Sequence, residues 1–306
     1  MPELPEVEVV RAGLAPAVSG ATITAVTIFD ERSLRRHDGP AEDFVERLVG
    51  STISVAARRG KFLWFPLLER DAVGSATALV AHLGMSGQML LRDRQTDDRL
   101  TRIRFDFAHP EHGALRLNFV DQRIFGSMAI DSLVATRDGG PGGFTGDASL
   151  DAPLVPSHVA HIARDPLDPA FDDDRFLDAL ASKSSGIKRV LLDQRVVSGI
   201  GNIYADESLW AAKVHFDQPA SRLSRRRART LLGEVREVLA KALLEGGTSF
   251  DSQYVNVNGA SGYFSHSLNA YGQQGKPCPR CGRPIRRIQF MNRGSHLCTW
   301  CQRLTR

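Results

Sequence analysis

The placement of four cysteines constrains this chain more than any other feature of its sequence. They form two C-x2-C pairs separated by sixteen residues, Cys278, Cys281, Cys298 and Cys301. Each pair can come from one tight turn, and four thiolates can close a tetrahedral zinc site. Two disulfides are the alternative, which a chain with no other cysteine and no secretion signal disfavours. The spacing therefore predicts one structural zinc ion that folds a segment too short to build its own core.

Charge is unevenly distributed along the chain. The formal net charge is +4, yet residues 271–306 carry eight basic residues and no acid, so the other 270 residues sum to −4. A basic segment on a mildly acidic body suggests a polyanionic partner. Charge alone would equally suit a solvated tail, but the cysteine pattern favours a folded basic module.

Length and the N-terminal residues restrict the class of protein further. The chain has 306 residues, enough for about two domains of ordinary size. No stretch approaches the ~20 uninterrupted apolar residues of a membrane helix. The opening MPELPEVEVVR has acids where a signal peptide would carry basic residues. We therefore expect a cytoplasmic protein without a membrane segment.

Hydrophobic patterning predicts a strand-rich half followed by a helical half. Apolar residues at helical spacing predict one amphipathic helix over residues 4–18. From 21 to about 131, short β-rich segments between Gly, Pro or Asp clusters predict a sandwich or barrel. The Gly-rich stretch 137–147 is typical of a boundary loop, and the pattern becomes helical after about 170.

The motif SGIGN, residues 198–202, lies between two predicted helices. Its glycines free the backbone, and we expect Asn202 to cap the following helix so that amide groups point outward. An exposed helix N-terminus of this kind binds phosphate well, although most Gly-rich turns are only turns. The stretch 276–301 is predicted to form a β-hairpin around zinc.

Seven motifs occur in an order and spacing that resemble the formamidopyrimidine-DNA glycosylase family (Fpg), bacterial enzymes that remove 8-oxoguanine and ring-opened purines. They are MPELPEVE, RRGKFLW (58–64), HLGMSGQ (82–88), DQRIFG (121–126), LLDQRVVSGIGNIYADESLW (191–210), GGTSF (246–250) and NRGS (292–295). The resemblance covers nearly the whole chain. The related endonuclease VIII-like enzymes typically open with MPEGPE, so Leu4 fits the formamidopyrimidine branch better.

The resemblance implies an α+β multidomain fold in four parts. These are an N-terminal β-sandwich with a leading helix (1–136), a linker (137–165), a helix–two-turn–helix DNA-binding domain (166–268) and a zinc-finger β-hairpin (269–306). It implies a monomer that binds double-stranded DNA containing oxidised bases or abasic sites. The implied activity is bifunctional: base excision repair of oxidised purines by a glycosylase, and β,δ-elimination by an abasic-site lyase.

The same resemblance gives catalytic roles to four residues. Pro2 becomes the N-terminus once the initiator methionine is removed, and its amine, with an α-amino pKa of roughly 7.7–8.0, attacks the sugar C1′. The resulting iminium is an electron sink for strand cleavage. Glu3 is the general acid that protonates the sugar ring oxygen. Lys61 contacts a phosphate beside the lesion and assists β-elimination, and Arg293 grips the flanking phosphates and is implicated in δ-elimination.

Further positions match residues that contact DNA. Met85, Arg123 and Phe125 match the wedge that fills the gap left by the flipped base, with Arg123 pairing with the orphaned cytosine. On hydrophobic pattern alone Met85 and Phe125 would be core residues, but both lie in glycine-bearing turns.

Lys183, Lys188 and Asn202 are candidate phosphate contacts, although both lysines suit a plain solvated role equally well. Residues 248–264 match the loop that caps the lesion. Glu6 looks like a supporting carboxylate, but an acid in the first helical turn also suits the helix dipole.

Two features depart from the family pattern. Leu100 stands where many relatives carry a phosphate-contacting histidine, so that contact is either missing or supplied by Arg99 or Arg102. The loop 137–150 is longer and richer in glycine than usual.

Three other interpretations remain open. An endonuclease VIII-like enzyme would prefer oxidised pyrimidines. A silent damage-binding protein would be expected to lack Pro2, Glu3 or Lys61. A zinc-ribbon nucleic-acid binder explains the basic tail but leaves the N-terminal motif without a role.

Overall fold

The computed structural model describes residues 2–68, 76–93, 95–96, 98–248, 257 and 262–305. These residues divide into two compact units. The first contains residues 6–161 and the described part of 249–262; the second contains 162–248, 263–305 and Glu3–Pro5. The division falls inside the predicted linker and keeps the C-terminal hairpin with the helices.

The first unit is an antiparallel sheet with a leading helix, α1 (Leu4–Val18), and a short helix α2 (Ala41–Leu48). Its hydrogen-bonded strand order is β10-β9-β5-β4-β2-β1-β7-β8-β6, with β3 pairing to β4. The strands are β1 (Thr22–Ile28), β2 (Thr52–Ile53), β3 (Ala57–Arg59), β4 (Phe62–Leu68), β5 (Thr77–His82), β6 (Gly87–Arg92), β7 (Thr101–His109), β8 (Gly113–Asp121), β9 (Ser127–Ala135) and β10 (Leu154–Pro156).

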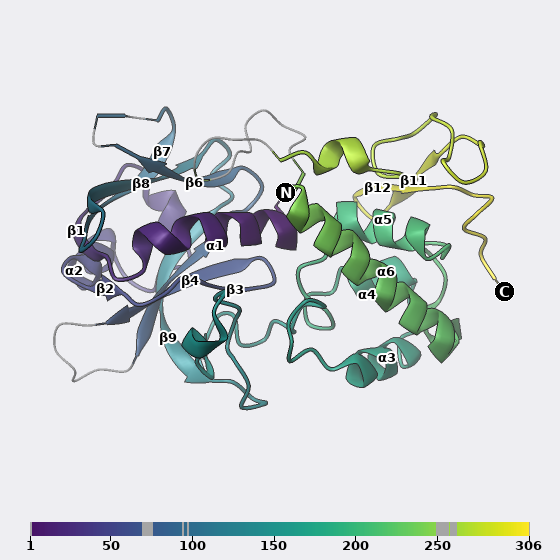
Figure 1. Cartoon of the computed structure of the whole chain (residues 1–306), viewed down its shortest axis with the longest axis horizontal. Helices are drawn as coiled ribbons and strands as arrows, with labels where there is room; N and C mark the ends of the chain where they lie inside the picture. The colour runs from purple at the N-terminus through teal and green to yellow at the C-terminus, as the bar shows by residue number, and fades with distance from the viewer. Residues whose placement is uncertain are drawn as a thin grey trace. The chain divides into compact units, whose positions relative to one another are not determined.

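One hydrophobic core joins strands from both ends of this path. It contains Leu79 and Ile130 from β5 and β9 together with Phe105 and Phe119 from β7 and β8. Val10 and its neighbours on α1 pack into the same core, and Figure 1 shows α1 running between the β6–β7–β8 strands and the β4 strand. The alternating burial along β7 reflects the period of two that sends successive side chains to opposite faces.

The Gly-rich segment after β9 packs closely against β3. Phe144 exchanges both backbone hydrogen bonds with Arg58, at 2.8 and 3.0 Å. A Cβ on Gly143 would overlap the Trp64 ring, and one on Gly142 would overlap the Leu154 carbonyl. These close approaches explain Gly142 and Gly143, and the Phe144 pairing extends the sheet edge locally where an open linker was expected.

The second unit contains α3 (Asp173–Ala181), α4 (Ile187–Leu191), α5 (Asn202–Ala211) and α6 (Arg225–Leu244). The strands β11 (Arg286–Phe290) and β12 (Arg293–Leu297) form the C-terminal hairpin. Four short 3-10 turns complete the described elements of both units: η1 (Glu31–Leu34), η2 (Ala148–Leu150), η3 (Ala220–Arg222) and η4 (Phe264–Ser267).

The core of the second unit takes apolar side chains from all four helices and from the hairpin. Ser224 caps α6 by accepting the Arg227 N–H, as expected of a serine before a helical run. The predicted α+β fold, with its leading helix, strand-rich part, helical part and four-cysteine hairpin, is confirmed. Among the described residues, no helix combines the length and apolarity needed to cross a membrane.

Candidate functional site

The Glu3 carboxylate lies at the N-terminus of α5. It accepts hydrogen bonds from the backbone N–H groups of Gly201 at 2.5 Å, Ile203 at 2.9 Å and Tyr204 at 3.4 Å. The Leu4 N–H in turn donates to the Gly199 carbonyl at 2.9 Å. Glu3 is 2% exposed, so an acid buried in the second unit is held by donors that a helix leaves unpaired at its start.

Two glycines of the SGIGN motif make room for this arrangement. Gly199 has φ +86° and a Cβ on it would crowd the Leu4 side chain. A Cβ on Gly201 would fall on the Glu3 carboxylate itself. The motif is therefore shaped to receive the first residues of the chain.

The expected role of Asn202 as helix cap is wrong. Gly201 is the N-cap residue and makes no side-chain cap hydrogen bond, and α5 begins at Asn202. The N–H groups that we expected to point outward toward phosphate are bound by Glu3. The Asn202 amide instead donates to the Gly294 carbonyl at 3.1 Å, in strand β12 of the hairpin.

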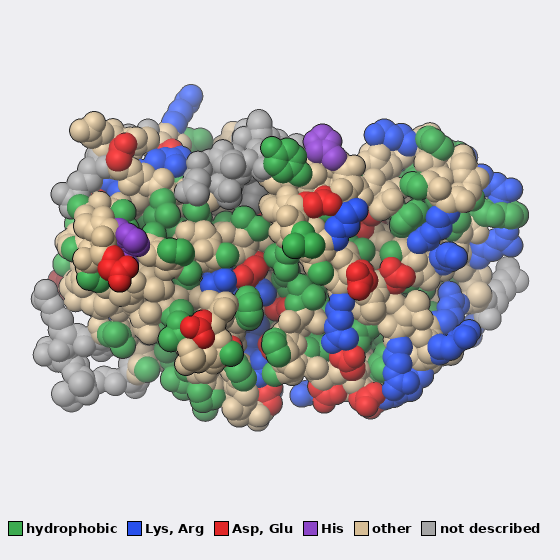
Figure 2. All heavy atoms as spheres, viewed as in Figure 1, with side chains coloured by type: hydrophobic (Ala, Val, Ile, Leu, Met, Phe, Trp, Pro, Cys, Tyr) green, Lys and Arg blue, Asp and Glu red, His purple; other side chains and the backbone are tan. Residues whose placement is uncertain are grey.

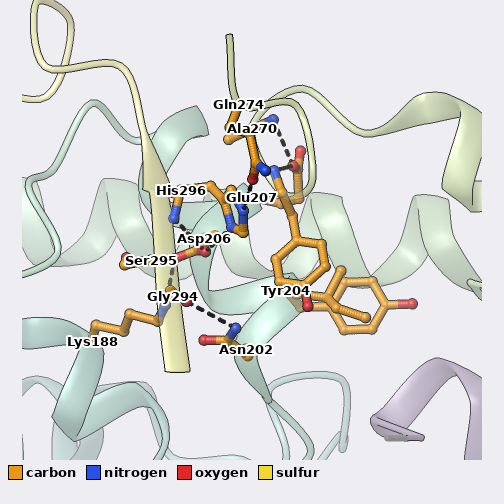
Figure 3. A network of polar contacts seen from close by, with 12 residues as sticks. Lys188, Asn202, Tyr204, Asp206, Glu207, Ala270, Gln274, Gly294, Ser295 and His296 are labelled. Carbon is orange, nitrogen blue, oxygen red and sulfur yellow. Dashed lines mark hydrogen bonds and ion pairs between the residues drawn. The ribbon is translucent and has the colours of Figure 1, made fainter. Parts of the chain in front are cut away.

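Asp206, one turn further along α5, joins three segments of the second unit (Figure 3). Its carboxylate accepts from Lys188 Nζ at 2.6 Å, from Ser295 Oγ at 2.9 Å and from the His296 backbone N–H at 2.7 Å. His296 Nε2 also lies 3.2 Å from Gln274 Oε1. Because Lys188 is on α4 and Ser295 on β12, this single carboxylate fixes the hairpin against the helix pair.

The neighbouring Glu207 holds the segment that precedes the hairpin. It accepts the backbone N–H groups of Asn269, Ala270 and Tyr271 at 2.8–3.0 Å (Figure 3). Burial raises the pKa of Glu207, and these backbone hydrogen bonds oppose the rise. Sequence reasoning missed both acids. The available signal was an Asp-Glu pair in a helix whose other residues are mostly apolar, since acids on such a face need buried partners.

The two candidate phosphate-contacting lysines differ in their surroundings. Lys183 is exposed. Lys188 is 0% exposed, with its ammonium on Asp206 and 5.0 Å from the centre of the Phe290 ring. Burial lowers the pKa of Lys188, and the Asp206 charge opposes this shift. In this position Lys188 braces α4 against α5, and a phosphate could not reach its ammonium.

Arg293 is exposed at the first position of β12, next to the Gly294 carbonyl that Asn202 binds. Three predicted site residues of the second unit, Glu3, Asn202 and Arg293, therefore gather around the N-terminal end of α5. Their nearness follows from two sets of hydrogen bonds: Glu3 accepts N–H groups at the start of α5, and Asn202, the first residue of α5, donates to Gly294 beside Arg293.

The four cysteines also converge in the second unit. Their Sγ atoms all lie within 4.8 Å of one another, and Cys281 Sγ and Cys298 Sγ are 3.5 Å apart. Four thiolates around one zinc ion, with bonds of about 2.3 Å, stand about 3.8 Å apart, so the cluster fits zinc. Trp210, Ala270 and Ile285 pack on Cys278 and Cys298 and shield the site from water.

The predicted catalytic residues of the first unit lie near its leading helix and in the β3–β4 turn. Pro2 is buried, Lys61 is half-buried, and Glu6 is buried in the first turn of α1. His82, at the end of β5, has a pKa shifted by its surroundings. Burial, followed by the charges of Arg36, Lys61 and Arg35, lowers the pKa of His82 to about 4.

The three predicted wedge residues are exposed on two neighbouring loops of the first unit. Met85 is 43% exposed and Phe125 is 50% exposed, and Arg123 is also exposed. The loop of Met85 joins β5 to β6, and the loop of Arg123 and Phe125 joins β8 to β9. Large apolar side chains exposed on ordered turns are typical of a binding surface rather than a core.

Two other predicted features are partly described. Most of the lesion-capping segment 248–264 lies outside the described residues, but Val257 is buried in the first unit's core, where its carbonyl accepts the Leu91 N–H. Leu100 is exposed with φ +70°. Arg102 binds the Asp121 carbonyl and lies 3.4 Å from Asp30, whereas Arg99 is exposed and is better placed to replace a missing contact.

Basic side chains crowd the helical unit's surface over α6 and the hairpin (Figure 2). Along α6 some of them are paired, because Arg225 and Arg236 form ion pairs with Asp174, Asp178 and Asp173 of α3 at 2.6–2.7 Å. The segment 271–306, which contains the hairpin, has no acid in its sequence. Its field is therefore net positive, as suits a polyanionic partner.

Three family models match successive parts of the chain. The formamidopyrimidine-DNA glycosylase N-terminal domain matches residues 1–128, the formamidopyrimidine-DNA glycosylase H2TH domain matches 162–253, and the zinc finger found in FPG and IleRS matches 275–304. The last match and the cysteine cluster confirm the predicted zinc site. The chain is 64% identical over 305 residues to the formamidopyrimidine-DNA glycosylase of Leifsonia xyli, covering 99% of this chain and 100% of that one. It is 51% identical to that of Kineococcus radiotolerans, covering 100% and 99%.

Solved structures agree with these relatives. The MutM (Fpg) protein of Thermus thermophilus is 34% identical with a TM-score of 0.78, covering 100% of both chains. Lactococcus lactis Fpg in complex with DNA containing an abasic site is 28% identical with a TM-score of 0.79, covering 98% of this chain and 99% of that one. The chain therefore belongs to the formamidopyrimidine-DNA glycosylase family of DNA-repair glycosylases with a C-terminal zinc finger.

Proposed function

We propose that this chain excises oxidised purines from double-stranded DNA through its N-terminal proline and then cuts the strand at the abasic site. The observation that carries the proposal is the Glu3 carboxylate, fixed by three backbone N–H groups at α5 and covalently next to Pro2. A secondary amine joined to an immobilised carboxyl group is the pairing that nucleophilic attack with acid catalysis requires.

DNA as the partner has support of its own. The matched Lactococcus lactis structures contain DNA with an abasic site or with N7-benzyl-Fapy-dG. The positive segment 271–306 and the exposed Arg293 and Lys183 supply phosphate contacts to the same partner.

The proposed reaction begins with base excision and continues with strand cleavage. The neutral Pro2 nitrogen forms a bond to C1′ as the glycosidic bond breaks, and the proton of the proline N–H goes to the departing base. Glu3 gives a proton to the ring oxygen as the sugar opens, which produces a cationic iminium between Pro2 and C1′. The Glu3 carboxylate, now deprotonated, takes a C2′ proton as the 3′ phosphate leaves, and loss of a C4′ proton to water then expels the 5′ phosphate. Lys61 and Arg293 hold those phosphates as they depart.

Borohydride trapping tests this proposal directly. The protein is incubated with a duplex that holds 8-oxoguanine opposite cytosine, and borohydride then reduces any iminium to a stable covalent adduct. We expect a protein–DNA band together with β,δ-elimination products. Pro2→Gly should abolish or badly slow strand cleavage while DNA binding persists.

A form with one uncleaved residue ahead of Pro2 is the matched control, since it keeps every side chain but converts the proline amine to an amide. Trapping by this blocked form would contradict the assignment of the nucleophile. Comparing excision of thymine glycol with excision of 8-oxoguanine tests the endonuclease VIII-like alternative. A strong preference for the oxidised pyrimidine would overturn the purine assignment. Binding without trapping, on both the 8-oxoguanine and the abasic duplex, would indicate a silent damage-binding protein.

A further inference from the structure

The two loops that carry the wedge residues are joined by one buried carboxylate. Asp121, the last residue of β8, is 0% exposed. Its Oδ1 accepts from Ser86 Oγ at 2.6 Å and from the Arg123 N–H at 3.1 Å, and its Oδ2 accepts from the Gly126 N–H at 2.7 Å. Ser86 belongs to the loop of Met85, so Asp121 binds both loops at once.

The backbones of the two loops also touch directly. Gly84 has φ +65°, and a Cβ there would fall on the Phe125 carbonyl group and the Gly126 nitrogen. Since an L side chain rarely adopts that φ and has no room here, glycine is the residue this contact requires. The loop of Met85 and the loop of Phe125 are thus packed as one body, which we call the wedge platform (residues 83–86 and 122–126).

Arg35 also binds the wedge platform. Its guanidinium donates to three successive carbonyls, those of Ile124 at 3.2 Å, Phe125 at 2.6 Å and Gly126 at 2.6 Å. Ile124 has φ +55°, a conformation that a β-branched residue adopts only when its surroundings impose it. The rigid fork of an arginine, with several donors, can bind three carbonyls of one turn, whereas an ammonium cannot match that geometry.

We propose that Arg35 and Asp121 are positioning residues for base extrusion: they fix the wedge platform before DNA arrives. This inference rests on the proposed function, because it assigns Met85 and Phe125 the task of filling the gap in the stack. Their side chains are exposed, whereas the backbone of the wedge platform is hydrogen-bonded to Arg35 and to Asp121. A preorganised wedge loses little conformational entropy on insertion, so more of its contact energy offsets the cost of unstacking the lesion.

The test compares two duplexes that differ in whether a damaged base must be extruded. Arg35→Ala should slow single-turnover excision of 8-oxoguanine opposite cytosine at least about tenfold, while strand cleavage at a preformed abasic site stays within about twofold of wild type. Arg35→Lys should recover part of the loss. Arg32→Ala removes an exposed arginine of η1, the short helix that Arg35 directly follows. Arg32 pairs with Asp30, and the variant serves as the matched control with wild-type rates on both duplexes.

Hydrogen–deuterium exchange without DNA measures the bracing independently of catalysis. Arg35→Ala should speed exchange of peptides covering 122–126, and Arg32→Ala should not. If Arg35→Ala does not fold, Ser86→Ala removes a single donor to Asp121 and should give a smaller change of the same kind. Equal slowing on both duplexes, or unchanged exchange, would overturn the positioning role. A wild-type protein inactive on both duplexes would instead refute the proposed function, and the exchange data would still decide whether Arg35 braces the platform.

Discussion

Glu3 binds Gly201 across 198 residues of sequence, through a hydrogen bond of 2.5 Å from the Gly201 N–H to the Glu3 carboxylate. The glycine has no side chain to interfere, and a Cβ at its position would overlap the carboxylate. The Gly-rich turn before α5 therefore fixes Glu3, the residue that follows Pro2 in the sequence.

Gly201→Ala should displace Glu3 and cut the rate of base excision by about 100-fold, because a misplacement of about 1 Å costs that much in a positioned site. DNA binding should persist, because the exposed Lys183 and Arg293 that we propose as phosphate contacts are unchanged. Gly233→Ala is the control: that glycine is inside α6 with open space around its Cβ position, so the variant should keep full activity and gain about 0.5–1 kcal/mol in stability. Equal rates for the two variants in single-turnover assays would refute the role of this contact.

Lys188→Met should destabilise the protein by about 3–5 kcal/mol, because it leaves Asp206 buried without its cation. The double variant Lys188→Met, Asp206→Asn should recover part of that loss, since a neutral amide removes the unpaired buried charge and its oxygen can still accept the His296 N–H. Urea unfolding measures the free energy of unfolding of the single and the double variant. Arg225→Met breaks exposed ion pairs with Asp174 and Asp178 and should cost far less, because water screens exposed charges. A loss no greater for Lys188→Met than for Arg225→Met would contradict the bracing role.

Lys183→Ala should weaken DNA affinity and lower the slope of log K against log salt by about 0.9, the value for one phosphate contact. Its stability should be unchanged, because the side chain is exposed. The binding constant is measured by fluorescence anisotropy between about 50 and 200 mM salt. Lys241→Ala removes a lysine of α6 that pairs with Glu245 and should leave the slope unaltered. An unaltered slope in Lys183→Ala would remove Lys183 from the DNA interface.

His82 should make the protein less stable in mild acid. Its pKa of about 4 in the folded chain lies below the ordinary 6.5, so the unfolded chain binds more protons between these values and stability falls as pH falls from 6.5 toward 4. The loss between pH 7 and pH 5 is up to about 2 kcal/mol. Protonation at Nδ1 would also end the hydrogen bond from the Gly84 N–H. His82→Asn should flatten this part of the pH profile of the urea midpoint, and parallel profiles would contradict the assignment.

Cys298→Ser should release zinc and unfold the hairpin, because the metal supplies most of the folding free energy of so small a core. Bound zinc is measured by atomic absorption, and DNA affinity should fall because the hairpin carries Arg293. Thr299→Ala changes an exposed neighbour and should retain both metal and affinity. A zinc-free variant with undiminished affinity would show that the metal does not support DNA binding.

The zinc cluster and the order of the elements could be predicted from the sequence because both depend on short-range information. Two C-x2-C turns bring their own thiolates together, and periodicity within 10–20 residues distinguishes strands from helices. The glycines around Met85 and Phe125 likewise indicated turns, and both side chains are exposed.

Tertiary structure decided which polar groups meet. Local reasoning predicted that Asn202 caps α5. Glu3, 198 residues before Gly201, binds the N–H groups there instead, since a carboxylate binds unpaired N–H groups more strongly than an amide. Lys188 looked like a surface lysine until packing placed Asp206 beside it. Arg35 and Asp121 stood in no predicted site, because most of their partners are backbone carbonyls and N–H groups, which no sequence pattern can distinguish.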